Sequence, residues 1–319
     1  MALLFIDGVG IGRREPDLNP LARADLLLSR FRDAPDAPVA FGGRALALDP
    51  TFGVPGRPQS ASNQTALFTG LPAPHLIGRH VLGYPDRELR ALLARHSLVR
   101  GLVQAGRQAT FANGYPPAYL EALGLAAASS PEDGIADPIP MGVSPARRRH
   151  LRASASTLAF AAGSVPLRTL RHVRAGQALT HDVRGRAPRA AGLQVPERTP
   201  EEAARTLLAL SDAHDFTLFE HYLADVAGHA QDGAAAEATL RDFDLMLRAM
   251  LRDRPRELTV LVVSDHGNVE DLSIRQHTLN PVPLLAFGPG ASELQDVQTL
   301  SDVGGSILRL LGAPPPRLD

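Results

Sequence analysis

The sequence predicts an α/β fold in which helices sandwich a mostly parallel sheet, and three observations lead to this class. Short runs of apolar and β-branched residues, such as Thr259–Val263, have the length and composition of buried strands. Segments of helical length and pattern separate these runs along the chain. Several runs lead into an acidic residue, and open α/β sheets place their chemistry at the carboxyl ends of strands.

The composition bounds the class of protein. The 319 residues are enough for one large or two ordinary domains, and two unequal domains fit best. A net charge of −1 gives no sign of a nucleic-acid surface. No run approaches the roughly 18 apolar residues of a membrane span, and Met1–Ile6 lacks the basic start of a signal peptide. We expect a cytoplasmic protein without membrane or nucleic-acid partners, whose oligomeric state stays open.

Two residue types are missing from the chain. There is no cysteine, which excludes disulfides, thiolate metal sites and cysteine nucleophiles. All 33 basic residues are arginine, which excludes any mechanism that needs a lysine ammonium. A metal ion would therefore have to be held by oxygen and imidazole ligands.

The first predicted strand, Ala2–Ile6, leads into Asp7 and the glycine-rich turn Gly8–Gly12. Glycines let the backbone pass close to a ligand. A dinucleotide site is an alternative, but the spacing is GxGxG rather than GxGxxG and no clear helix start follows.

A predicted helix has Ser60 at its N-cap position and ends at Gly70. A hydroxyl at a helix N-terminus lies where the helix dipole favours an alkoxide and an incoming phosphate. The alternative is that Ser60 only caps the helix.

From residue 85 to residue 196 the pattern changes to short helical pieces, a predicted strand at Ala109–Ala112, and frequent proline or glycine. We interpret 85–196 as a small inserted cap domain, and 1–84 with 197–319 as a discontinuous metal-binding core. A loop excursion is the alternative.

Alternating helices and strands resume after the expected cap and indicate a parallel sheet covered on both faces. The predicted elements are a helix at Pro200–Leu210, a strand at Phe216–Tyr222, a helix at Ala234–Leu251, the strand named above, a strand at Val282–Phe287 and a helix at Asp302–Leu311.

Three aspartates and three histidines lie next to predicted strands: Asp7, Asp225, His229, Asp265, His266 and His277. Each alone has an ordinary alternative role in a turn or on the surface. Together they are the ligands that suit Zn²⁺ or Mn²⁺. Two metal ions about 3.5 to 4 Å apart can hold the attacking and leaving oxygens of a phosphoryl transfer. Ser60 is the candidate nucleophile.

This set of motifs resembles the alkaline phosphatase superfamily, and within it the cofactor-independent phosphoglycerate mutase and phosphopentomutase branch. The resembling segments are Ile6–Gly8, Ser60–Gly70, Asp225–His229, Ser264–Asn268, His277–Pro283 and Leu300–Gly312. The resemblance implies an alkaline-phosphatase-like core around two divalent metal ions, with Mn²⁺ favoured and Zn²⁺ possible.

The resemblance also implies roles for single residues. Ser60 would be the phosphorylated nucleophile, chosen over Ser62 and Thr65 by its interval from Gly70. One ion would be surrounded by Asp7, Ser60, Asp265 and His266, and the other held by Asp225, His229 and His277.

The sequence departs from the mutases in several ways. It has no lysine to place near the phosphate, and the arginine-rich and aspartate-rich cap motifs are absent. Asn63 stands where mutases tend to have glycine and nucleotide pyrophosphatase/phosphodiesterases have asparagine; it would donate to a phosphoryl oxygen or cap the helix. Substrate anions would need arginine, and the candidates are Arg79, Arg147–Arg149 and Arg152.

These features favour a metal-dependent phosphoryl-transfer enzyme acting on a small phosphorylated metabolite. A phosphatase or phosphodiesterase is slightly favoured, because a reduced cap would exclude water poorly. A cofactor-independent phosphomutase is the first alternative. A non-catalytic metal-binding module is the second, although such a module would usually lack a ligand or the nucleophile.

Overall fold

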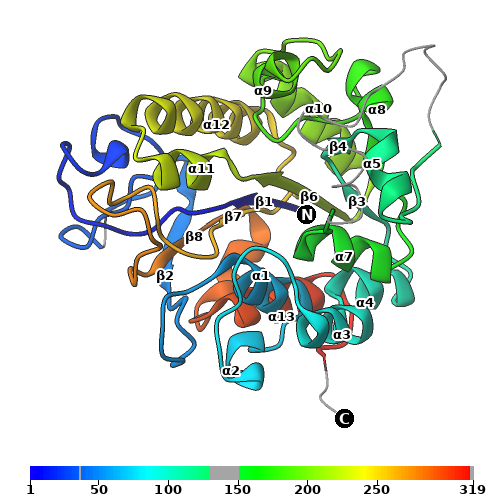
Figure 1. Ribbon diagram of the computed structural model, residues 1–319, viewed down its shortest axis with the longest axis horizontal. Helices are drawn as coiled ribbons and strands as arrows, with labels where there is room; N and C mark the ends of the chain where they lie inside the picture. The colour runs from blue at the N-terminus through cyan, green and yellow to red at the C-terminus, as the bar shows by residue number, and fades with distance from the viewer. Residues whose placement is uncertain (36, 130–150, 317–319) are drawn as a thin grey trace.

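The computed structural model describes residues 1–35, 37–129 and 151–316, and a six-stranded sheet forms its centre (Figure 1). In spatial order the strands are β2 (Arg44–Leu48), β8 (Val282–Phe287), β7 (Val260–Val263), β1 (Ala2–Ile6), β6 (Phe216–His221) and β3 (Ala109–Phe111). Strands β7, β1, β6 and β3 are parallel, whereas β8 runs antiparallel to both β7 and β2. The three central strands β7, β1 and β6 therefore end at the same edge of the sheet.

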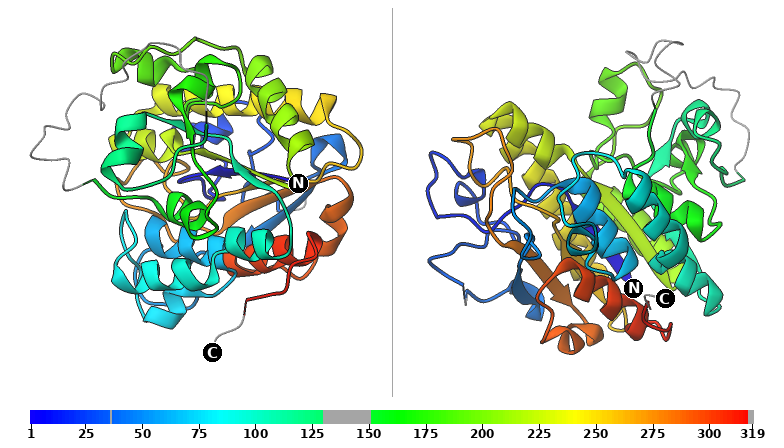
Figure 2. Two further views of the ribbon diagram at one scale, coloured as in Figure 1. Left: turned by 90° about the vertical axis from the view of Figure 1, so that its right-hand side faces the viewer. Right: turned by 60° about the horizontal axis from the view of Figure 1, so that its bottom comes forward.

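Side chains of β1 alternate between two hydrophobic cores, as the period of a strand requires. Leu3 and Phe5 pack into one core, and Leu4 and Ile6 pack into the other. The first core is covered by α1 (Ser60–Thr69), α3 (Arg87–His96), α4 (Leu98–Gln104), α7 (Ala155–Ala162) and α13 (Leu300–Leu310). The second is covered by α10 (Pro200–Ala213), α11 (Leu223–Ala230) and α12 (Gly233–Asp253). Figure 2 shows the two layers from further directions.

The shorter elements lie around these layers. They are α2 (Ala73–Ile77), α5 (Pro117–Ala122), α8 (Leu170–Arg174), α9 (Arg186–Ala190), a small parallel pair of β4 (Gly114–Tyr115) and β5 (Arg168–Thr169), and 3-10 turns at Pro20–Ala22, Ala40–Gly42 and Pro289–Leu294. Among the described residues, no helix combines the length and apolar character of a membrane span.

The α/β class and the mostly parallel sheet are confirmed, and several details are corrected. Strand β2 was not predicted, and β8 is antiparallel. Helix α1 begins one residue earlier than expected: Gln59 is its N-cap and Ser60 its first helical residue. The predicted end at Gly70 is confirmed, because Gly70 adopts the left-handed conformation with φ of 68°.

The boundary of the expected cap is corrected at its N-terminal end. Strand β3 pairs with β6 in the central sheet, and Leu89 of α3 and Phe160 of α7 pack into the same core as α1. The sequence pattern changes at about residue 85, but the apolar faces of α3 and α7 still pack against the main core. A separate small core is formed by Leu170, Val173, Ala178, Leu193 and Val195. That this part works as a cap stays a prediction.

Candidate metal centre

Three of the predicted ligands gather at the carboxyl ends of β1 and β7. Asp7 follows β1, and Asp265 and His266 follow β7; we call these three residues the first cluster. His266 Nε2 lies 3.2 Å from Asp7 Oδ1 and 3.5 Å from Asp265 Oδ2. The parallel pairing of β1 with β7 brings these positions together although they are far apart in sequence.

Ser60 stands directly at the first cluster. Its Oγ lies 2.9 Å from His266 Nε2. Because Ser60 is the first residue of α1, the positive end of the helix dipole lies beside its hydroxyl. The hydroxyl is thus placed among ligand-type side chains instead of capping the helix.

The carboxyl groups of the first cluster are buried close to one another. Burial, followed by the charges of Asp265 and Asp225, raises the pKa of Asp7 well above its usual range. Burial alone would lower the pKa of His266, but the surrounding carboxylates raise it to about 10. Asp7 Oδ1 is buried and has no regular hydrogen bond, only the contact with His266. Two buried carboxylates, an imidazole and such an oxygen fit a divalent cation.

The other three predicted ligands form a second cluster. Asp225 and His229 are four residues apart on one face of α11, and His277 comes from the loop before β8. His229 Nε2 lies 3.3 Å and His277 Nε2 lies 3.6 Å from the Asp225 carboxylate. One potential ligand atom from each residue lies within 4.8 Å of the others.

Hydrogen bonds to carbonyl groups orient both histidines of the second cluster. His229 Nδ1 lies 2.7 Å from Arg275 O, and His277 Nδ1 lies 2.8 Å from Pro58 O. Because a carbonyl can only accept, each Nδ1 carries the proton and each Nε2 keeps a free lone pair when the ring is neutral. The two Nε2 atoms face each other at 3.1 Å, an arrangement that suits a cation.

The two clusters form one continuous centre. The rings of His266 and His277 stack with their centroids 3.6 Å apart and their planes at 13°. The structure therefore brings all seven predicted residues together in the two groups that the sequence resemblance implies. Their roles as ligands and nucleophile remain proposals.

Three further polar residues support the centre and were not predicted. Gln64, one turn after Ser60 on α1, donates to Asp265 Oδ2 at 3.0 Å. Asn268 donates to Asp225 Oδ1 at 2.7 Å. Glu270 is only 2% exposed and accepts from the backbone N–H groups of Gly10, at 2.9 Å, and Asn268, at 2.8 Å. The spacing of Gln64 from Ser60 could have indicated the first of these, and the position of Asn268 at the end of the Ser264–Asn268 motif could have indicated the second; no local pattern indicates Glu270.

The two predicted substrate-binding residues do not face the centre. The Asn63 amide is buried and donates at 2.8 Å to the carbonyl oxygens of both Pro50 and Asp265, so it neither binds a phosphoryl oxygen nor caps the helix. Arg79 is exposed and forms ion pairs with Asp86 and Glu88. Both assignments are corrected. Residues 147–149 lie outside the described residues, and the exposed Arg152 does not line the cavity described next.

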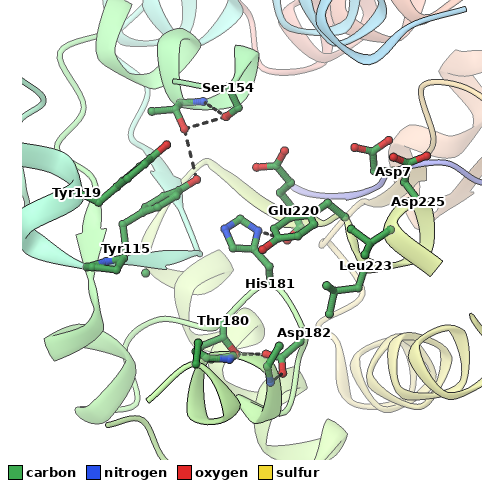
Figure 3. Close-up of a pocket in the computed structure, with 18 of the residues that line it drawn as sticks. Asp7, Tyr115, Tyr119, Ser154, Thr180, His181, Asp182, Glu220, Leu223 and Asp225 are labelled. Carbon is green, nitrogen blue, oxygen red and sulfur yellow. Dashed lines mark hydrogen bonds between the residues drawn. The ribbon is translucent and has the colours of Figure 1, made fainter. Parts of the chain in front are cut away.

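A cavity of about 570 Å³ opens beside the centre (Figure 3). Asp7, Ser60 and Asp225 line one end of it. Its walls continue to Tyr115 and to His181, whose Nδ1 lies 3.0 Å from Glu220 O in β6. The volume suits a small molecule.

Comparison with protein families matches residues 190–315 to the Metalloenzyme superfamily. Five of the seven predicted residues lie in this segment: Asp225, His229, Asp265, His266 and His277.

Curated relatives match parts of the chain. A 2,3-bisphosphoglycerate-independent phosphoglycerate mutase of Desulforudis audaxviator is 35% identical over 129 residues, which are 38% of this chain and 25% of the relative. A phosphopentomutase of Methylorubrum extorquens is 34% identical over 103 residues, covering 32% of this chain and 24% of the relative. The chain thus spans about a quarter of the length of these relatives.

Solved structures match the fold over almost the whole chain. Alkaline phosphatase from the Antarctic bacterium TAB5 has a TM-score of 0.53 at 13% identity, covering 98% of this chain and 97% of that one. A cold-active alkaline phosphatase from Shewanella sp. has a TM-score of 0.53 at 15% identity, covering 99% and 100%. At this identity the likeness concerns the fold. Together these findings confirm the resemblance: residues 190–315 match the Metalloenzyme superfamily, and the fold is similar to that of the alkaline phosphatases.

Proposed function

We propose that this protein is a metal-dependent phosphoryl-transfer enzyme that acts on a small phosphate ester through a phosphoserine at Ser60. The observation that carries the proposal is the Ser60 hydroxyl, 2.9 Å from His266 Nε2, at a helix N-terminus and beside two adjoining ligand clusters. Substrate reaches this hydroxyl through the cavity that Ser60 lines.

The proposed reaction has two displacements. Ser60 Oγ forms a bond to phosphorus while the bond between phosphorus and the leaving oxygen breaks, and the leaving alcohol takes up a proton. Water then attacks the phosphoserine, releases inorganic phosphate and restores the Ser60 hydroxyl. Divalent ions held by the two clusters would stabilise the serine alkoxide and the charge on the transferring phosphoryl group.

The proposed ligand sets are Asp7, Ser60, Asp265 and His266 for one ion, and Asp225, His229 and His277 for the other. The Metalloenzyme superfamily match supports divalent metal ions as cofactors. We favour Mn²⁺ from the resemblance to the mutases; Zn²⁺ is the alternative, since both ions accept carboxylate and imidazole ligands. Reconstitution of metal-depleted protein with each ion, followed by activity measurement, tests this preference.

We slightly favour hydrolysis over intramolecular transfer. Tyr84 and Tyr222, which line the cavity, are 47% and 41% exposed, which supports access of water. A mutase has to exclude water while it holds the dephosphorylated intermediate. A phosphomutase is the second candidate, because the matched relatives are named phosphoglycerate mutase and phosphopentomutase.

The test is release of inorganic phosphate from a panel of small phosphate esters with Mn²⁺ or Zn²⁺. We expect release with the unmodified protein, none with Ser60→Ala, and near-normal release with Ser62→Ala, whose hydroxyl instead bonds Gln59 O at 3.1 Å. Acid quenching followed by mass spectrometry should find phosphate on Ser60. An active Ser60→Ala protein would overturn the nucleophile assignment. Isomerisation of an ester without phosphate release would favour the mutase.

A further inference from the structure

All four tyrosines of the chain line the cavity beside the metal centre: Tyr84, Tyr115, Tyr119 and Tyr222. Tyr115 and Tyr119 are neighbours in sequence, whereas Tyr84 and Tyr222 come from other segments, so only the fold brings all four together. The stacked rings of Tyr115 and Tyr119 lie 5.7 Å apart with their planes at 13°. We call the part of the cavity formed by these tyrosines and His181 the aromatic compartment.

His181 joins the tyrosines into a continuous wall. Its ring centroid lies 5.6 Å from that of Tyr115 and 4.8 Å from that of Tyr222. Burial lowers the pKa of His181 to about 4, so the ring is neutral near pH 7. The wall therefore offers π-electron faces and edges but no positive charge of its own.

One buried carboxylate faces this compartment. Glu220, in β6, is 5% exposed and lines the cavity, and its Oε2 accepts from Ser156 Oγ at 2.8 Å. In the view of Figure 3 its carboxylate lies between the Tyr115–Tyr119 pair and the carboxylates of Asp7 and Asp225. Burial raises the pKa of Glu220 to about 7, so its carboxyl group is partly ionised near neutral pH, and a cation beside it would favour the ionised form.

The other acidic residue at this end is already occupied by the protein. Asp182 accepts from Thr180 Oγ1 at 2.6 Å and from the backbone N–H groups of Gly185, at 2.9 Å, and Ala187, at 2.7 Å. These bonds fix the turn before α9. Within the part of the chain that the structure describes, the Glu220 carboxylate accepts from Ser156 alone, so part of its acceptor capacity is left for a ligand.

No arginine stands among the described residues that line the cavity. With metal ions in place, the end at Ser60 offers positive charge, whereas the other end offers Glu220 and aromatic rings. The cavity therefore suits a molecule with phosphate at one end and a cation at the other. Aromatic faces attract ammonium groups by about 0.5 to 2 kcal/mol.

We propose that the aromatic compartment binds an alkylammonium group, so that the substrate is the phosphate ester of an amino alcohol. The ammonium group lies against Glu220 and the tyrosine rings while the phosphate reaches Ser60. The assignment of the substrate rests on the proposed function, whereas the binding of the cation does not depend on it. A carboxylate in the leaving group, as in phosphoglycerate, would meet Glu220 with like charge.

Binding can be tested without turnover, because the chain has no tryptophan and all its tyrosines line this cavity. Intrinsic tyrosine fluorescence of the metal-loaded protein therefore reports on the compartment. We expect choline to change the emission saturably. The neutral isostere 3,3-dimethyl-1-butanol should need at least about 10 times the concentration, since it lacks the charge that attracts aromatic rings and carboxylates.

Glu220→Gln keeps the shape of the side chain and should remove most of this preference. Glu121→Gln is the matched control, since it removes the same charge from an exposed position on α5 that does not line the cavity. Thermal unfolding checks that both variants fold. If Glu220→Gln does not fold, Tyr119→Leu serves as the second variant and should weaken choline binding about 10-fold through loss of the stacked pair.

Turnover gives the second measurement. We expect kcat/KM for phosphocholine to exceed that for 3-phosphoglycerate by at least about 10-fold, the factor that 1.4 kcal/mol corresponds to. Equal binding of choline and its neutral isostere, or a preference that survives Glu220→Gln, would overturn the inference. Choline binding without hydrolysis of any ester would leave the cation site standing and contradict the proposed reaction. Hydrolysis of phosphate esters with no preference for those that carry an amine would support the proposed reaction and overturn the cation site.

Discussion

Replacing Gly228 by alanine should weaken metal binding at the second cluster. Gly228 lies in α11 between Asp225 and His229. A Cβ atom built at this position would be 2.7 Å from both Cγ and Oδ1 of Asn268. A real Cβ atom essentially never comes this close to another heavy atom, so Asn268 or the helix has to move. Either movement disturbs the hydrogen bond from Asn268 to Asp225, which measures 2.7 Å.

The size of the effect follows from that hydrogen bond. A hydrogen bond to a charged group contributes about 1.5 to 3 kcal/mol, which is a factor of about 10 to 150 in an equilibrium constant. Loss of a residue that orients a metal ligand typically lowers metal affinity about 10- to 100-fold. We therefore expect Gly228→Ala to weaken the second metal site about 10- to 100-fold.

The thermal stability of the variants provides an independent test. Alanine in place of glycine inside a helix normally stabilises a protein by about 0.5 to 1 kcal/mol. Gly305 in α13 is a matched control, because a Cβ atom there would have no neighbour within 4 Å. We expect Gly305→Ala to raise the unfolding temperature slightly and leave metal affinity unchanged, whereas Gly228→Ala should lower both.

Calorimetric titration of metal-depleted protein with Mn²⁺ measures the two affinities. Asn268→Ala should reproduce the loss seen in Gly228→Ala, and the double variant should be no weaker than either single variant, because all act through one hydrogen bond. A Gly228→Ala protein that gains stability as Gly305→Ala does, and binds Mn²⁺ normally, would refute the reasoning.

Three further predictions concern the same centre. Gln64→Leu should weaken the first metal site about 10- to 100-fold by removing a donor from Asp265, and unchanged Mn²⁺ titration would contradict this. Glu270→Ala should lower the free energy of unfolding by several kcal/mol, because Gly10 N–H and Asn268 N–H both donate to Glu270. Each buried donor left without an acceptor costs about 1 to 3 kcal/mol. Denaturant unfolding measures the loss, and a loss below about 1 kcal/mol would refute the prediction. Removing metal with a chelator should lower the unfolding temperature, since the buried carboxylates then repel one another, and adding Mn²⁺ should restore it; a chelator-insensitive melting curve would argue against tightly held ions.

Features that depend on local sequence were predicted well. Strands β1, β6 and β7 are short apolar runs, and the end of α1 at Gly70 follows from the need for a left-handed residue. Asp7, Asp265 and His266 of the first cluster were predicted because each directly follows or closely follows β1 or β7, and Asp225 because it comes soon after β6. The residue types and their spacing along the chain are enough to predict such positions.

Features that depend on partners far along the chain were missed or misplaced. Strand β2 is an edge strand with mixed exposure, and only pairing with β8 makes it a strand. Strand β3 was assigned to a cap because it follows a change in composition, yet it completes the central sheet beside β6. Asn63 and Arg79 were misassigned because the acceptors that occupy them lie in other segments or emerge only from folding.

The sequence by itself determined the class of fold, and it predicted seven residues for a centre of divalent ions, because strand runs, helix ends and ligand types are local properties. Only the tertiary structure decided that these residues form two adjoining clusters, that Gln64, Asn268 and Glu270 support them, and that all four tyrosines meet at one cavity. These contacts join residues up to about 260 positions apart, as between Gly10 and Glu270, and the sheet register that brings them together is a property of the whole packed core.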